Sequence, residues 1–377
     1  MELVPSRYNE MPTLVPAFEK SDWKRIEFKN ADQEINDKID NGVCIHVHTF
    51  YIPELSKILN SLKESRGIVG RLIITTSIKS REKLEQIKEL ISESVYNENS
   101  MIINTQNTGR NIKPLFIEAW EEIRRYKYCI HLHTKRTITN KSESYGKEWL
   151  ESIIFRLSNG RQLKNCIAIM EQDKKIGIVM PKPYEGCAKY SLGWAGTYEV
   201  AMRILRKYLS ENYTDSNILE HQYNPLVFPV GGMMIFRTRS LDKTAEWLKN
   251  NKCFLDIKEP LPGQSYLHAI ERLLVIFIEL NGYKWRVVDN QDTGSIHVMN
   301  TDSKISCLNP ERELYKKLAN AALHEDSQLY RRVIELETRL RYNQLRIGGI
   351  LVLIKDMTIK LIKKNKNRFP VSLLRLK

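Results

Sequence analysis

Two short apolar segments of this chain end in the same pattern of histidines. One segment ends in His46-x-His48 and the other in His131-x-His133, and a threonine follows each pattern. In an open α/β sheet, ligands bind at the carboxyl ends of the strands. Imidazoles at such an edge can donate hydrogen bonds to phosphate oxygens. The pattern therefore predicts an anion-binding cleft in an enzyme that handles a phosphorylated substrate.

A lysine follows the second histidine pair. His131, His133 and Lys135 alternate with other residues, so at a period of two they point to one side of the strand end. Lysine is a compact point charge that suits a diphosphate. Two alternatives remain open. One is a polar strand end that faces solvent, and the other is a zinc site built from the two histidine pairs, although structural zinc sites made only of histidine are unusual.

A loop with a glycine and an arginine lies between the two histidine pairs. It contains Asn107, Gly109, Arg110 and Asn111, and it precedes a helix expected to begin near Lys113. Gly109 permits a positive φ and a close approach of the backbone. The start of the helix offers free N–H groups to an anion. The alternative is an ordinary turn with an asparagine cap.

Two adjacent glycines, Gly231 and Gly232, lie in a segment expected to be a strand, directly before Met233. Because they have no side chains, they let the backbone lie against a flat ligand such as a sugar. The alternative is a bulge or tight packing.

One helix carries three functional groups on one face. His268, Glu271 and Arg272 are spaced at i, i+3 and i+4, and residues at this spacing are neighbours on a helix. A carboxylate and an imidazole on one face could supply a general base. The alternative is a surface ion cluster on a helix whose other face packs in the core.

Apolar runs alternate with amphipathic segments along most of the chain. Strands are expected at 43–47, 71–75, 101–104, 127–132, 176–180, 229–237 and 283–288, and helices at 53–63, 81–92, 113–126, 147–157, 199–209, 241–249 and 266–281. Strands separated by helices of this length predict a mostly parallel α/β sheet flanked by helices. Residues 1–40 are expected to form an irregular arm, residues 41–300 the main domain, and residues 311–377 a helical extension.

Composition and charge limit the class of protein. The chain has 377 residues, of which 42% are hydrophobic and 28% are charged, so it can bury a core. Most of the net charge of +14 lies in residues 341–377, which contain ten Lys or Arg and one acid. This basic amphipathic tail predicts a helix that lies on an anionic membrane surface, with packing on a partner as the alternative. No nucleic-acid partner is expected, because most of the basic excess lies in the tail and no nucleic-acid-binding motif is present.

The expected location is the cytoplasm, with peripheral attachment to the inner face of the plasma membrane. The first residues lack a basic n-region and an apolar h-region, and no apolar run approaches the roughly 18–20 residues of a membrane-spanning helix. The six cysteines form no C-x-x-C pair, which fits a reducing compartment without a disulfide framework.

These motifs occur in the order found in the rhamnan synthesis F family of bacterial polysaccharide glycosyltransferases, which the chain resembles over residues 43–290. The motifs that carry the resemblance are His46-Val47-His48 with Tyr51, Asn107-Thr108-Gly109-Arg110-Asn111 with Pro114-Leu115-Phe116, His131-Leu132-His133-Thr134-Lys135, Phe228-Pro229-Val230-Gly231-Gly232-Met233-Met234, and His268-Ala269-Ile270-Glu271-Arg272. The resemblance implies a GT-A-like Rossmann-type fold. It also implies transfer of rhamnose or another hexose from a nucleotide-sugar donor to a glycan or lipid-linked glycan acceptor, in the synthesis of a cell-surface polysaccharide.

The resemblance further implies roles for individual residues. Arg110, His131 and Lys135 would stabilise the charge that develops on the diphosphate. Glu271 or His268 would take the proton of the acceptor hydroxyl. The sugar or acceptor would be contacted by Gly231, Gly232, Met233 and Arg272. The donor would be bound by His46, His48, Tyr51, Thr75, Thr76, Ser77, Asn107, Gly109, Arg110, Asn111, His131 and His133.

The chain differs from the usual GT-A enzyme at one strand end, and it departs from the family pattern itself in two places. In the usual GT-A enzyme the strand that corresponds to 127–132 ends in Asp-x-Asp, which holds a divalent cation beside the diphosphate, whereas here it ends in histidines. No cofactor is therefore expected, with a divalent cation as the alternative. Asn111 replaces the family's aspartate, and Gly263-Gln264-Ser265 replaces D-G-T. If either aspartate were catalytic, the chain would need a substitute, which keeps open a catalytically inactive carbohydrate-binding or scaffold subunit.

Overall fold

The computed structural model describes residues 15–16, 23–27, 42–65, 67–134, 143–158, 160–184, 197–212, 226–256, 266–289, 295–299 and 307–308. Contacts divide the chain into two compact units, one of residues 16–306 and the other of residues 1–15 with 307–377. Lys135, residues 263–265 and the expected basic helix within 311–377 lie outside the described residues. Two short strands, β1 (Val15–Pro16) and β11 (Cys307–Leu308), pair as a separate sheet.

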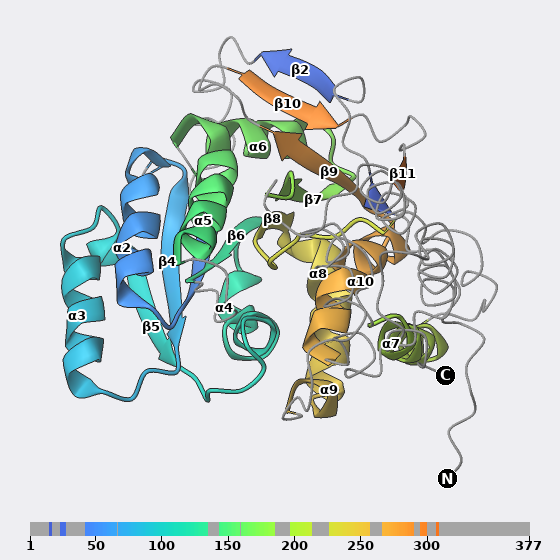
Figure 1. Cartoon of the computed structure of the whole chain (residues 1–377), viewed down its shortest axis with the longest axis horizontal. Coiled ribbons are helices and arrows are strands. Elements are labelled where there is room, and N and C mark those ends of the chain that lie inside the picture. Colours follow the sequence, from blue (N-terminus) through green and yellow to red (C-terminus); the bar gives the residue numbers. More distant parts are fainter. Residues whose placement is uncertain are drawn as a thin grey trace, which may run out of the picture. The chain divides into compact units, whose positions relative to one another are not determined.

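The larger unit is built on a sheet in which nine strands are described, in the order β2-β10-β9-β7-β8-β6-β3-β4-β5 (Figure 1). Seven of them run in one direction and only β8 and β10 run in the other. The prediction of a mostly parallel α/β sheet is therefore confirmed. The strands are β2 (Trp23–Glu27), β3 (Val43–Thr49), β4 (Val69–Thr76), β5 (Ser100–Asn104), β6 (Tyr128–His133), β7 (Ile176–Pro181), β8 (Met234–Arg237), β9 (Lys284–Asp289) and β10 (Ser295–Met299).

The order of the strands reverses at β3. From β3 the chain moves outward to β4 and then to β5, and it returns to place β6 on the opposite side of β3. In open α/β sheets, ligands bind in the crevice at such a switch point, outside the carboxyl ends of the strands. One histidine pair lies at the carboxyl end of β3 and the other at the carboxyl end of β6, the two strands beside this switch point. The topology therefore favours a ligand site there.

Helices cover both faces of the sheet. Along β3, Val43, Ile45 and Val47 belong to one core and Cys44 to the other, as the two-residue period of a strand requires. The core on the Val43 side includes residues of α2 (Ile52–Ser61), α3 (Arg81–Ser92), α5 (Glu143–Leu157) and α6 (Gly160–Gln172). The core on the Cys44 side includes residues of η5 (Pro114–Glu118), α4 (Trp120–Ile123), α7 (Tyr198–Asn212), α8 (Thr238–Asn250), α9 (Cys253–Asp256) and α10 (Tyr266–Leu280).

Two short 3₁₀ turns, η3 (Lys63–Ser65) and η4 (Asn97–Asn99), complete the described helical elements. No helix within the described ranges is long and apolar enough to cross a membrane. By the same alternation along β3, His46 and His48 project to the Cys44 side of the sheet.

The helix expected at 113–126 is interrupted. It begins as the π-helical turn η5, in which the Ala119 N–H donates to the Pro114 carbonyl oxygen at 3.0 Å, and it continues as α4. Proline at its start costs nothing, because the first N–H groups of a helix have no intrahelical partner. π-Helical turns are rare and occur frequently at functional sites. This π-helical turn comes shortly after the loop of Asn107, Gly109, Arg110 and Asn111, here named the Gly-Arg loop. The Leu115 and Phe116 side chains of the turn are buried in the core.

Three other elements differ from the expectations. The strand expected at 229–237 begins only at Met234, because Gly231 and Gly232 have φ values of 89° and 73° and form a turn. β2 lies inside the expected irregular arm, so that prediction is wrong for Trp23–Glu27, which pairs with β10. α6 has no counterpart among the expected helices, since it follows α5 with only a short break.

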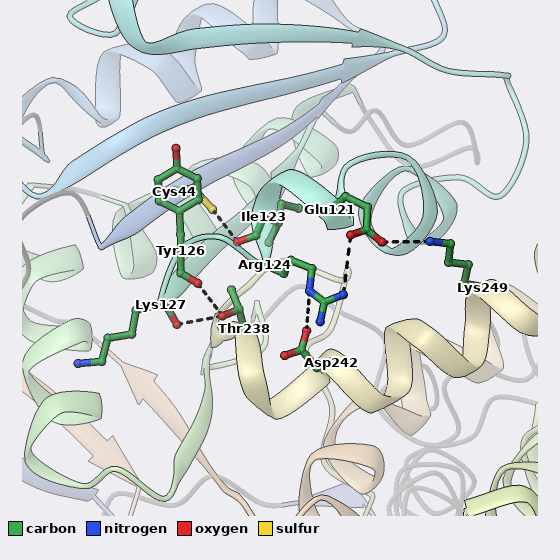
Figure 2. A network of polar contacts seen from close by, with 9 residues as sticks. All are labelled: Cys44, Glu121, Ile123, Arg124, Tyr126, Lys127, Thr238, Asp242 and Lys249. Carbon is green, nitrogen blue, oxygen red and sulfur yellow. Dashed lines mark hydrogen bonds and ion pairs between the residues drawn. The ribbon is translucent and has the colours of Figure 1, made fainter.

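Polar contacts tie α4 and the start of β6 to α8 (Figure 2). Figure 2 shows the ion pair between Glu121 and Lys249, at 3.0 Å, and the Thr238 hydroxyl donating to the Tyr126 carbonyl oxygen at 2.6 Å. Exposed ion pairs contribute little to stability. The part-buried Thr238 bond and the apolar core therefore do more to hold the entry to β6, the strand that carries the second histidine pair.

Candidate functional site

The sheet brings the two histidine pairs together. β3 and β6 are adjacent and parallel, and their register places His46 beside His131 and His48 beside His133. The Nδ1 atoms of His46 and His131 are 2.9 Å apart, the ring centres are 4.9 Å apart, and the ring planes are inclined by only 15°. The nitrogens are too close for stacked rings, so the two imidazoles meet edge to edge through a hydrogen bond.

Thr75 of β4 extends this contact. Its Oγ1 lies 2.9 Å from His46 Nε2 and 3.0 Å from His48 Nδ1, so one hydroxyl group bonds both histidines of β3. Thr75, His46 and His131 are fully buried, whereas His48 is only partly buried. Three neighbouring strands thus hold one hydrogen-bonded cluster at the switch point.

These buried histidines are neutral at neutral pH. Burial lowers the pKa of His46 and of His131 well below the usual value for an imidazole, and the neighbouring histidines lower it further. Burial and the nearby His133 also lower the pKa of His48 to about 4. Of the two forms in which His131 could contact a diphosphate, the lowered pKa therefore favours the neutral one, which acts as a hydrogen-bond donor or acceptor and not as a cation.

The geometry gives no support to the zinc alternative. In His46 and His131 the two Nδ1 atoms face one another, and the other nitrogen of His46 faces Thr75. Ligands of one metal ion must instead point at a common centre. Over the described ranges, no group of three or more His, Cys, Asp or Glu side chains is arranged to hold a metal ion.

The double-glycine turn is held by groups from two other elements. His133 Nε2 lies 2.5 Å from the Gly231 carbonyl oxygen and donates to it, and the Gly231 N–H donates to Glu271 Oε1 at 3.0 Å. A Cβ on Gly232 would lie 2.5 Å from Asn111 Nδ2, so the loop packs directly on this glycine. The structure therefore brings together Gly231, Gly232, Asn111, His133 and Glu271, as predicted from their motifs.

Two buried polar atoms at this place have no hydrogen-bond partner among the described residues. They are His131 Nε2 and Asn111 Nδ2. Both residues are near His133: the ring centres of His131 and His133 are 6.1 Å apart, and the Gly232 backbone on which Asn111 packs is close to His133 Nε2. Because leaving such groups unpaired is costly, their presence favours a ligand or a water molecule at this place.

Arg110 contacts His268 across the site. Arg110 has a φ of 47°, in the left-handed region that residues other than glycine rarely adopt, and its Nη1 lies 2.5 Å from His268 Nε2. A guanidinium can only donate, so His268 Nε2 is the acceptor of this bond. His268 can then act as the predicted base at Nε2 only after Arg110 has moved away, which leaves Glu271 as the better candidate.

Two predicted acceptor contacts are wrong. Met233 is fully buried, and it packs in the core on the Val43 side of the sheet, away from the histidines. Arg272 is only 6% exposed, donates to the His268 carbonyl oxygen at 3.1 Å and lies over the ring of Phe228. Its side chain therefore fixes α10 and is not presented to an acceptor.

The remaining predicted donor residues lie where β3 and β4 end and in the following loops. Tyr51 is the residue before α2, Thr76 accepts a hydrogen bond from the Ile78 N–H at 3.2 Å, and Ser77 donates to Asn107 Oδ1 at 3.5 Å. Gly109 has a φ of 71°, and a side chain there would overlap Lys113. These residues therefore shape the loops at the carboxyl edge of the sheet.

A cavity of about 800 Å³ opens at the carboxyl ends of β4 and β5. Ser77 lines it, together with Lys79, Lys113, Lys252 and Glu118. Because it has three lysines to one carboxylate, the cavity suits an anionic ligand. β4 links the cavity to the histidine cluster, because Ser77, which lines the cavity, follows Thr75 of the cluster by two residues.

Most of the residues that line this cavity are not among the site residues predicted from the sequence. Asn104 ends β5, and Thr105 and Gln106 directly follow it, so the rule that ligands bind at strand ends is a signal that could have found them. Lys252 comes from the turn between α8 and α9, and no local pattern marks it.

Thr134 positions the strand ends. It belongs to the motif His131-Leu132-His133-Thr134-Lys135, but the sequence alone predicts no function for it. Its hydroxyl oxygen accepts the N–H groups of Phe50 and Tyr51 at 2.8 and 3.0 Å, and its own N–H donates to the His48 carbonyl oxygen at 3.0 Å. Thr134 thereby fixes the turn after β3 against the end of β6, which keeps the two histidine pairs in register.

The fold defines an α/β protein of Rossmann-like type, with a candidate ligand site at the strand ends that flank the switch point. Residues 23–283 match the model of the family described as Rhamnan synthesis protein F. This match covers more than half of the chain, so the chain belongs to that family, whose description concerns the synthesis of a rhamnan polysaccharide. A comparison with curated proteins finds no match.

Proposed function

We propose that the protein is a glycosyltransferase of bacterial cell-surface polysaccharide synthesis. It transfers a sugar, rhamnose or another hexose, from a nucleotide-sugar donor to a glycan acceptor. The observation that carries the proposal is the lysine-lined cavity at the carboxyl ends of β4 and β5, on the same sheet edge as the histidine cluster, in a chain that belongs to a rhamnan synthesis family. A cavity of about 800 Å³ falls within the range that ligands of this size occupy.

The nucleotide part of the donor would occupy the cavity. Lys79, Lys113 and Lys252 supply positive charge for the phosphates, and Asn104 and Gln106 supply amide groups that can pair with a base. Lys113 is only 8% exposed and donates to Thr108 Oγ1 at 3.1 Å, so its ammonium group is held in place before a ligand arrives.

The diphosphate would lie toward the Gly-Arg loop. Arg110 and Lys135 would stabilise the charge that develops on the leaving group, as fixed positive charges do in a site that excludes water. His48, which is neutral because burial lowers its pKa, and His133 would contribute hydrogen bonds. The architecture would be a variant of the GT-A type in which these cations replace the usual metal ion, so activity is expected to survive EDTA.

The acceptor would approach along the double-glycine turn. Glu271 accepts the Gly231 N–H through one carboxylate oxygen, and its second oxygen would take the proton of the acceptor hydroxyl as general base. Gly231 and Gly232 have no side chains, so the sugar could lie against the backbone.

The acceptor is proposed to be a glycan carried on a lipid, because the basic amphipathic segment within residues 311–377 suits an anionic membrane surface. The protein would then work at the cytoplasmic face of the membrane. Sedimentation of the full chain with vesicles that contain anionic lipid, against neutral vesicles, tests this part. Equal recovery in the two pellets would argue against it.

Binding of a panel of nucleotide sugars, scored by protection against thermal unfolding with and without EDTA, tests the proposed function. A donor at 100 times its Kd stabilises a protein by about 2.7 kcal/mol. We expect a shift with one donor that is the same in EDTA. No shift with any donor would favour the inactive scaffold subunit, which the replacement of the family's aspartate by Asn111 also allows.

A further inference from the structure

Four side chains of the site form one continuous series of hydrogen bonds. His131 Nδ1 meets His46 Nδ1 at 2.9 Å, and His46 Nε2 meets Thr75 Oγ1 at 2.9 Å. The same Thr75 oxygen meets His48 Nδ1 at 3.0 Å. The residues come from the adjacent strands β6, β3 and β4, so the register of the sheet fixes each contact.

We propose that this series, the histidine relay, moves one proton between His131 Nε2 and His48 Nε2 by a coupled change of tautomer. The proposal goes beyond the transferase function and does not depend on it, because the hydrogen bonds that carry it are present in the protein without a ligand.

The relay has two matched settings, because a neutral imidazole carries one N–H and one lone pair. In the first, His131 donates from Nδ1 to His46, His46 donates from Nε2 to Thr75, and the Thr75 hydroxyl donates to His48 Nδ1. His48 then carries its proton on Nε2. In the second, all three bonds are reversed, so that His131 carries its proton on Nε2 and His48 donates from Nδ1.

Each passage between the settings balances. A proton binds His131 Nε2, and the Nδ1 proton of His131 moves to His46. The Nε2 proton of His46 moves to the Thr75 oxygen, the Thr75 proton moves to His48 Nδ1, and the Nε2 proton of His48 leaves. Every N–H or O–H bond that breaks is replaced by one that forms, and no net charge remains on the relay. The neutral state of the buried histidines, which burial favours, is the state that this exchange requires.

The two ends differ in their surroundings. His131 is fully buried, and its Nε2 has no hydrogen-bond partner within the described part of the chain, so this nitrogen has an unused position for a hydrogen bond to a hydroxyl group or a water molecule. His48 at the other end is only partly buried. An anion at His48 can only accept, so it would select the first setting and leave a lone pair at His131 Nε2. The relay would thus couple an anion at one end to a proton acceptor at the other.

Histidine tautomers in the full chain, labelled with ¹⁵N-histidine and observed by NMR at pH 7, test the relay. We expect His131 and His46 to be opposite tautomers and His46 and His48 to be the same one, or all three signals to be averaged together. Thr75→Val should remove the match between His46 and His48, and Thr75→Ser should retain it. Thr76→Val is the control, because the Thr76 hydroxyl contacts the Ile78 N–H and no histidine is among its described contacts.

The wild-type spectrum alone can overturn the proposal, even if Thr75→Val does not fold. His46 protonated on Nε2 together with His48 protonated on Nδ1 would mean that both donate to Thr75 and that the series is broken there. A doubly protonated His46 or His131 at pH 7 would equally exclude the relay.

Discussion

Replacement of Gly232 by alanine is expected to destabilise the protein through two separable effects. Gly232 has a φ of 73°, and this left-handed conformation costs an L-residue about 1–2 kcal/mol. A Cβ would also lie 2.5 Å from Asn111 Nδ2, so the amide must move. Crowding of this kind costs about 1–3 kcal/mol. The free energy of unfolding should therefore fall by about 2–5 kcal/mol.

Gly282 supplies a matched control for the first effect. It has a φ of 82°, but a Cβ there would meet no atom within 4 Å. Gly282→Ala should therefore cost only the conformational part, about 1–2 kcal/mol. In an Asn111→Ala background, the stability lost through Gly232→Ala should be no larger than that lost through Gly282→Ala, because the amide that the new Cβ would crowd is absent.

Urea unfolding of these variants, with the two single and the double substitutions treated as a cycle, measures the coupling between positions 111 and 232. A coupling near zero, or a cost of Gly232→Ala no larger than that of Gly282→Ala, would refute the reasoning. The turn would then not require glycine for its close packing on Asn111.

Three further predictions concern charge. Burial alone would raise the pKa of Asp289, but a lysine and an arginine donate to it at 3.0 and 2.9 Å and hold the pKa below its usual value. A carboxyl group whose pKa is lower in the folded than in the unfolded protein stabilises the fold at pH values above its unfolded-state pKa, which is about 4. This stability is lost as the pH falls through the pKa of the folded state. The free energy of unfolding should therefore decline below about pH 4, and this decline should be smaller in Asp289→Asn. Identical pH dependences of the two proteins would contradict the prediction. Glu271→Gln keeps an acceptor for the Gly231 N–H but loses the base, so kcat should fall by about 10²–10⁴-fold at an unchanged Tm; full turnover would remove Glu271 from the mechanism. Lys113→Met should weaken donor binding about tenfold by calorimetry, whereas Lys57→Met on α2, outside the cavity lining, should not, and equal Kd values for the two would place the phosphates elsewhere.

The sheet and the meeting of the histidine pairs could be predicted from the sequence. The run at 43–47 is almost wholly apolar and ends in polar residues, which fixes both a buried strand and its carboxyl end. Two such ends belong to one edge of a parallel sheet, so His46 and His131 were expected to be close. β2 was missed because Trp23–Glu27 contains three charged residues and lies at the edge of the sheet, where burial imposes no apolar pattern.

The chemical state of the site could not be predicted in the same way. The histidines suggest cations in the sequence, but burial lowers the pKa of His46, His48 and His131 and keeps these three neutral, and burial depends on the folded arrangement. Met233 follows two functional glycines, yet the turn sends its side chain to the other face of the sheet. Lys252 reaches the cavity only because α8 packs beside η5, a contact between distant parts of the chain.

Turnover of the nucleotide-sugar donor tests the central claim most directly. The full chain would be incubated with each nucleotide sugar, with and without a glycan acceptor and EDTA, and release of the nucleoside diphosphate would be measured. The account predicts that one donor is consumed, faster with acceptor, at a rate that EDTA does not change. Consumption of none of the donors would contradict the transferase, and loss of activity in EDTA would contradict a site in which cations of the chain replace the metal ion.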